Sequence, residues 1–63
     1  MFDLDKELKE GEFLRVPTEE RIELFELMRE KYPKGNPKSQ LRMMMEISDD
    51  RISVYRDIFT SKE

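Results

Sequence analysis

The sequence lacks cysteine, histidine and tryptophan, and it contains only two glycines among 63 residues. Without cysteine and histidine, the chain cannot form disulfides, ordinary zinc sites or the histidine-dependent pairs of nucleophilic catalysis. The two glycines, Gly11 and Gly35, are too far apart for a glycine-rich phosphate loop. The remaining acid–base groups form no pair that stands out from the charged background. We therefore expect no enzyme, no metal site and no cofactor.

Long apolar runs are also absent, so the sequence predicts no membrane-spanning helix. The first residues, MFDLDKELKE, lack the basic start and apolar stretch that are typical of a secretion signal. Although 43% of the residues are charged, the net charge is only −3 and the apolar residues are regularly spaced, so we expect a folded chain. These features predict a small cytoplasmic protein without a membrane partner.

The short length limits the hydrophobic core. A chain of 63 residues buries only about 60% of the surface that its unfolded form exposes. A second copy of the chain would cover further apolar surface and offset the small core. We therefore expect a homodimer, with Met43, Val54 and Phe59 as its candidate contact patch.

Helical spacing of apolar residues accounts for most of the chain. The segment 2–10 carries two leucines four residues apart, with Asp3 as a cap and Gly11 at its end. The segment 18–32 begins at a capping threonine, stops before Pro33, and has an apolar stripe of Ile22, Phe25, Met28 and Tyr32.

Two further helices are expected in the second half. Asn36 and Pro37 fit a cap and a first helical position. That helix directs Leu41, Met44 and Met45 inward and Lys38, Gln40 and Arg42 outward. Ser48 is placed to cap a last helix at residues 49–59. The sequence thus predicts an all-α domain of three or four helices.

From Lys38 to Asp57 the sequence resembles the helix-turn-helix of small bacterial and phage regulators. Apolar residues occupy the five apolar places of that pattern: Leu41, Met45, Ile47, Ile52 and Tyr55. The preceding stretch is similar to the first helix and turn of the same unit, so the resemblance covers residues 18–59. Two places depart from the pattern, because Arg42 stands where alanine is usual and Glu46 where the turn usually has glycine. The resemblance implies a tri-helical helix-turn-helix core.

The resemblance also implies a small DNA-binding regulator, of a size that suits a phage or mobile element, reading DNA with helix 49–59. The residues expected on bases or phosphates are Arg51, Ser53 and Arg56, and those expected on phosphates are Lys34, Lys38 and Arg42. Three aspartates on or beside the same helix, Asp49, Asp50 and Asp57, oppose phosphate binding. Residues 17–63 would form the helix-turn-helix-like domain, and residues 1–16 an appendage or dimer arm.

A different class of function is suggested by the charge distribution. Residues 1–20 hold seven acidic and three basic residues, whereas residues 21–32 hold three of each. An acidic N-terminal side can bind the basic surface of a partner protein, as an interaction module or inhibitor would. It can also act only as a solvated face that keeps a small domain soluble. The acidic residues concerned are Asp3, Asp5, Glu7, Glu10, Glu12, Glu19 and Glu20.

Overall fold

The computed structural model describes residues 1–61, and every regular element in that range is helical. The elements are α1 (Leu4–Glu10), α2 (Glu19–Lys31), α3 (Pro37–Glu46), the short 3₁₀ helix η1 (Asp49–Arg51) and α4 (Ile52–Thr60). The prediction of a small all-α domain of three or four helices is confirmed. Within the described residues, the structure has no helix that is both long enough and apolar enough to cross a membrane.

Three of the helices begin where the capping residues predict. The Asp3 carboxylate accepts a hydrogen bond from the Lys6 amide at 3.2 Å, and Asn36 accepts one from the Ser39 amide at the same distance. The Thr18 hydroxyl accepts from the Arg21 amide at 3.3 Å. Each contact satisfies a backbone donor that has no partner inside its own helix.

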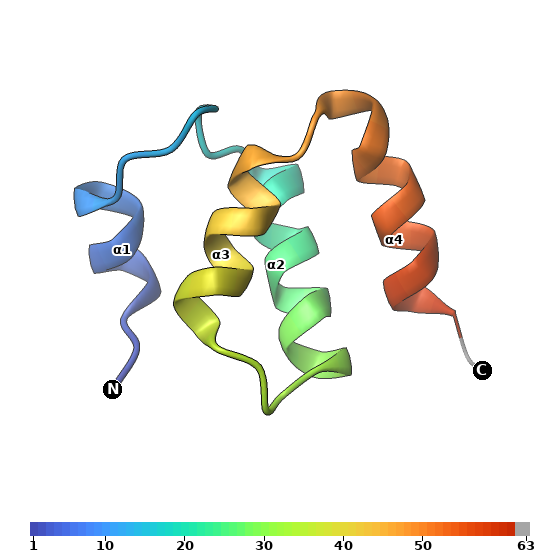
Figure 1. Cartoon of the computed structure of the whole chain (residues 1–63), viewed down its shortest axis with the longest axis horizontal. Helices are drawn as coiled ribbons and strands as arrows, with labels where there is room; N and C mark the ends of the chain where they lie inside the picture. The colour runs from blue at the N-terminus through green and yellow to red at the C-terminus, as the bar shows by residue number, and fades with distance from the viewer. Residues whose placement is uncertain (62–63) are drawn as a thin grey trace.

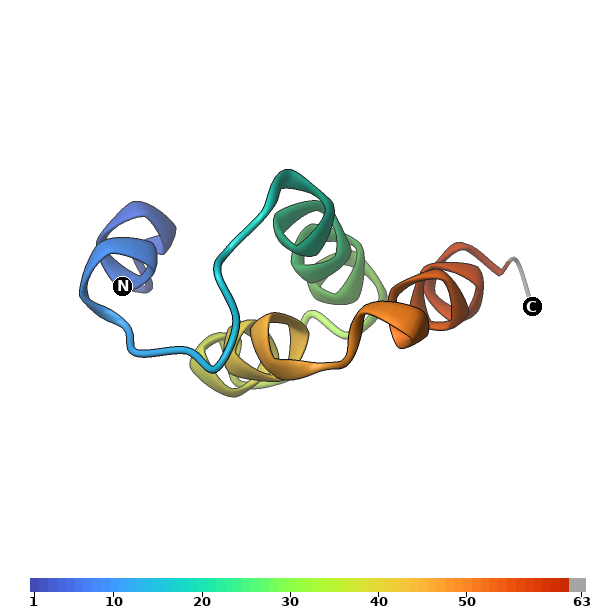
Figure 2. The ribbon, with the colours of Figure 1, turned by 90° about the horizontal axis from the view of Figure 1, so that it is seen from above.

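Helix α2 is the centre of the domain. It runs antiparallel to α3 and in the same direction as α4, and it packs against both of them (Figure 1). Seen along the helix axes, α1 and α4 lie at opposite ends of the molecule (Figure 2). The buried apolar core comes from α2, α3 and the start of α4 and consists of Leu24, Phe25, Leu41, Met44, Met45 and Ile52.

Helices α3 and α4 both pack on α2 and are joined by a short junction that includes η1. They run in opposite directions on either side of α2 (Figures 1 and 2). The junction contains no strained residue, because no residue from 1 to 61 has a positive φ angle. Glu46 therefore fits at the end of α3 without the glycine that the family's turn uses.

The last helix begins differently from the prediction for residues 49–59. Its first turn is the separate 3₁₀ helix η1, and the α-helical part starts at Ile52 and extends to Thr60. Ser48 occupies the N-cap position of η1, as expected, but its side chain makes no capping hydrogen bond to the backbone there.

Helix α1 is attached to the rest of the domain through a few apolar side chains. Its own residues are all exposed or half-buried, and Phe2, Leu4, Leu8 and Phe13 pack against the core from this end of the chain. The rings of Phe2 and Phe25 are 5.8 Å apart. The division into residues 1–16 and residues 17–63 stays a prediction.

Candidate functional site

A buried arginine joins α2 to the end of α3. Arg21 is only 2% exposed. Its guanidinium donates to the carbonyl oxygens of Met44 at 3.0 Å and Ile47 at 2.8 Å, and it forms a 2.6 Å ion pair with Asp49. Arg21 thus satisfies carbonyls at the C-terminal end of α3 and fixes the start of η1. No local signal predicts this role, since Arg21 follows two glutamates in the first turn of α2, where an exposed arginine would be equally expected.

A second polar contact closes the turn between α2 and α3. Gln40 was expected to face outward, but it is 5% exposed. Its amide nitrogen donates to the Tyr32 carbonyl at 3.0 Å, and its amide oxygen accepts from Arg29 at 3.0 Å. Arg29 also donates to the Gly35 carbonyl at 2.9 Å. The prediction for Gln40 is wrong because these partners, supplied by the neighbouring turn, satisfy a polar side chain inside the protein.

Three of the six predicted DNA-binding residues form ion pairs with acidic side chains. Lys38 lies 3.5 Å from Glu7 of α1. Two arginines are similarly engaged, since Arg42 pairs with Glu46 at 3.3 Å and Arg56 pairs with Glu20 at 3.4 Å. Lys38 therefore faces α1, while Arg56 faces α2 from the opposite end of the molecule (Figure 1).

The other three predicted residues, Lys34, Arg51 and Ser53, are exposed. They come from the α2–α3 turn, from η1 and from α4, whereas Lys38 and Arg42 belong to α3 and Arg56 to α4. Arg51 is next to the negatively charged Asp50. Hydrogen bonds from the Ser48 side chain and the Asp50 backbone amide hold the pKa of the Asp50 carboxyl below its ordinary value. Asp50 consequently stays ionised beside the start of α4.

The exposed side of α2 carries an acidic row, which we define as Glu19, Glu23, Glu26 and Glu30. The four glutamates are four, three and four residues apart, a spacing that places them on one face of a helix. All four are exposed, and none belongs to an ion pair within residues 1–61.

The basic residues of α2 do not neutralise this row. Arg21 is buried and Arg29 is half-buried, and both are occupied by the contacts described above. Lys31 is also half-buried. Residues 21–32 thus have no net charge, but their acidic and basic side chains lie in different places. The glutamates are exposed, and the two arginines are directed toward the other helices. The acidic row can be recognised from the sequence when the positions of the glutamates are compared with the period of a helix. A count of charges along the chain does not reveal it.

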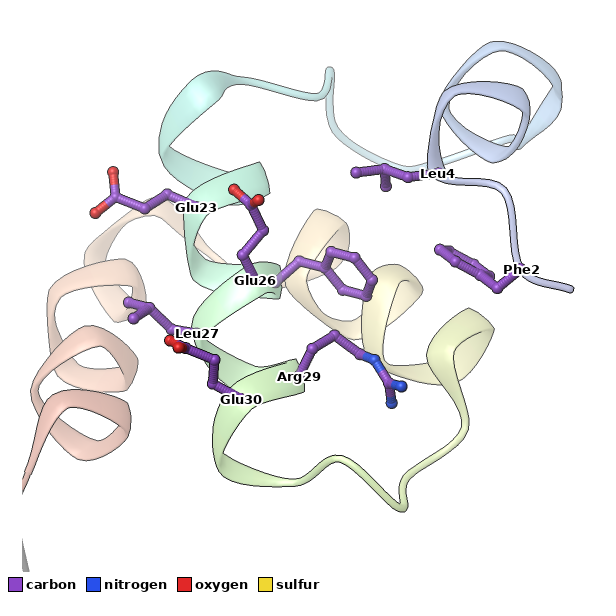
Figure 3. A pocket seen from close by; sticks show the side chains of 8 residues that line it. Phe2, Leu4, Glu23, Glu26, Leu27, Arg29 and Glu30 are labelled. Atoms are coloured by element: carbon purple, nitrogen blue, oxygen red, sulfur yellow. The ribbon is translucent and has the colours of Figure 1, made fainter.

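An open groove runs beside the acidic row, between the start of the chain and α2. Its volume is about 680 Å³, and its lining residues are Phe2, Leu4, Glu23, Phe25, Glu26, Leu27, Arg29 and Glu30. In Figure 3, Phe2 and Leu4 approach α2 from the α1 side, whereas Glu23, Leu27 and Glu30 project on the other side of the helix. The lining thus has an apolar side toward α1 and an acidic side across α2, with Glu26 between them (Figure 3).

The acidic N-terminal side predicted from the sequence is partly used within the fold. Asp3 caps α1, while Glu7 and Glu20 form ion pairs with Lys38 and Arg56. Asp5, Glu10, Glu12 and Glu19 are exposed. No group of three or more acidic side chains in the described part of the chain is arranged to hold a metal ion.

The comparisons with known proteins add no identification to this geometry. No protein-family model matches the chain, and no curated protein or solved structure matches it at a significant level.

Proposed function

We propose that this protein is an interaction module that binds a basic surface of a partner protein through the exposed side of α2. The observation that carries the proposal is the separation of charge on α2. Four glutamates are exposed on one face, while the arginines of the same helix are engaged inside the fold. A row of uncompensated carboxylates attracts a basic partner and repels acidic ones.

The geometry supports this alternative better than it supports DNA binding. Lys38, Arg42 and Arg56 already have acidic partners, so DNA phosphates would have to compete with Glu7, Glu46 and Glu20 for them. Arg51 is flanked by the ionised Asp50. Affinity for DNA depends mainly on unopposed cations near the phosphates. DNA binding through α4 stays a prediction, as do the homodimer and the cytoplasmic location.

An NMR titration tests the proposal. The probe is a synthetic alanine-based helix of about 18 residues, long enough to be partly helical alone, with lysines spaced i, i+3 and i+7 on one face. We expect weak, salt-dependent binding that shifts the backbone amide signals of α2, because each exposed ion pair contributes only about 0.2–1 kcal/mol. The double variant Glu23→Lys/Glu26→Lys should weaken the binding about tenfold, since two attractions become repulsions.

The matched control is Glu10→Lys/Glu12→Lys, which makes the same change in net charge at exposed positions away from α2. This control should retain most of the affinity. An equal loss in both double variants would mean that only the net charge matters, and it would contradict the proposal.

The same titration with duplex DNA separates the two functions. We expect no binding at about 50 mM salt. Micromolar binding that weakens steeply at about 200 mM salt and disappears with Arg51→Ala would support the DNA-binding prediction instead.

A further inference from the structure

We infer that the groove between the start of the chain and α2 receives an apolar side chain from a basic amphipathic helix of the partner. The inference rests on the proposed function and adds to it the shape of the partner and the way in which it is anchored. The acidic row would then provide attraction and orientation, and the groove would provide an apolar contact at its side.

The apolar side of the groove is suited to a single large aliphatic or aromatic side chain. The rings of Phe2 and Phe25 lie 5.8 Å apart and are tilted by 42° to each other, and Leu4 lines the same hollow. Phe25 is anchored in the core at 4% exposure, whereas Phe2 is half-buried. The hollow has a volume of about 680 Å³ and is open to solvent, so it offers room for one side chain at the surface without enclosing it.

The spacing of the carboxylates favours a helix as the occupant. Glu23, Glu26 and Glu30 advance by three and four residues, which corresponds to about 4.5 and 6 Å along the α2 axis. A second helix that lies along α2 presents lysines or arginines with the same advance when they are spaced i, i+3 and i+7. An extended strand repeats its side chains on one face about every 6.6 Å, so it would fall out of register with this row.

The charges that line the groove favour a basic occupant. Three carboxylates line the groove together with one cation, Arg29. The Arg29 guanidinium donates to the Gly35 carbonyl and the Gln40 side chain, which hold it toward the α2–α3 turn. An amphipathic helix with an apolar residue beside its basic face thus matches both properties of the groove, as in other helix-in-groove complexes.

The test compares two peptides that differ at one position. The first is the lysine-bearing alanine helix described above, and the second carries one leucine beside the lysine face. We expect the leucine peptide to bind the protein more tightly, by up to about tenfold, because contact with the apolar side of the groove removes part of the leucine side chain from water. The gain should fall to less than about twofold in Phe2→Ala, which removes one wall of the groove.

The control variant is Leu8→Ala, which weakens the packing of α1 on the core at a residue outside this groove. It should retain the advantage of the leucine peptide. If Leu8→Ala loses the advantage as completely as Phe2→Ala, the effect belongs to the attachment of α1 and the inference is overturned. Amide spectra of both variants verify that α2 and α3 remain folded.

The outcomes separate the inference from the proposed function. Equal binding of the two peptides to the unmodified protein overturns the inference and leaves the proposed function standing. Absence of binding by both peptides refutes the proposed function itself. If the groove amides shift with protein concentration alone, the occupant is a second copy of this chain, and the inference of a separate basic helix is overturned.

Discussion

Replacing Arg21 by methionine should remove a large part of the stability of this domain. The guanidinium makes three contacts: two hydrogen bonds to the carbonyls of Met44 and Ile47 and an ion pair with Asp49. Methionine fills a similar volume but leaves two carbonyl oxygens at the end of α3 without their donor. Each loss costs about 1–3 kcal/mol when the group is buried. We therefore expect a total loss of about 3 kcal/mol.

A loss of about 3 kcal/mol is large relative to the free energy of unfolding of a chain of this length. At about 0.05–0.15 kcal/mol per residue, a chain of 63 residues has a free energy of unfolding of about 3–9 kcal/mol. Arg21→Met should therefore leave the protein partly unfolded at room temperature or shift its urea midpoint strongly. Arg21→Lys keeps the charge but not the forked geometry, so it should cost about half as much.

Replacing Asp49, the carboxylate partner of Arg21, should cost much less stability than replacing Arg21. The Asp49 side chain is 83% exposed, whereas that of Arg21 is 3% exposed. Solvent screens an exposed carboxylate, so Asp49→Ala should cost less than about 1 kcal/mol despite the short ion pair. Urea unfolding followed by circular dichroism measures all three variants, with the slope m as a check that the unfolded state is unchanged. A cost below about 1 kcal/mol for Arg21→Met, or equal costs for Arg21→Met and Asp49→Ala, would refute the reasoning.

Two further predictions concern the turn between α2 and α3 and the start of η1. Gly35→Ala places a methyl group against the amide of the buried Gln40, so we expect a loss of about 1–2 kcal/mol in the same urea assay. A loss below about 0.5 kcal/mol would show that Gln40 moves aside freely. The lowered pKa of Asp50 in the folded state means that its ionised form adds stability above its ordinary pKa, and that this stability disappears as the pH falls through the lowered value. Asp50→Asn should therefore reduce the slope of melting temperature against pH below about pH 4, and an unchanged slope would contradict this assignment.

The parts of the fold that were predicted correctly depend on local chemistry. Asp3, Thr18 and Asn36 cap helices because their side-chain oxygens reach amide groups only three residues away. The parts that were missed depend on residues far along the chain. Gln40 is buried because Tyr32 and Arg29 supply its partners, and no spacing in the sequence encodes that meeting.

The candidate site shows the same division between local and distant effects. Two of the residues expected to bind DNA have acidic partners from distant parts of the chain, because Lys38 pairs with Glu7 of α1 and Arg56 pairs with Glu20 of α2. Packing of α3 and α4 on α2 likewise depends on contacts between residues far apart along the chain. Charge counts along the chain gave zero for residues 21–32 and concealed the acidic row.

Repulsion among the glutamates of the acidic row destabilises the folded state, and no ion pair within residues 1–61 offsets it. Like charges three or four residues apart on a helix are destabilising by about 0.2–0.5 kcal/mol per pair, and the row contains three such pairs. Glu19 is partly compensated by the positive N-terminal end of the α2 dipole, but Glu30 lies near the negative end. The row thus opposes stability by about 1 kcal/mol and contributes no internal ion pair among residues 1–61. Solubility requires a net charge, but it does not require that the carboxylates be aligned beside an apolar groove. A basic partner helix would use this alignment.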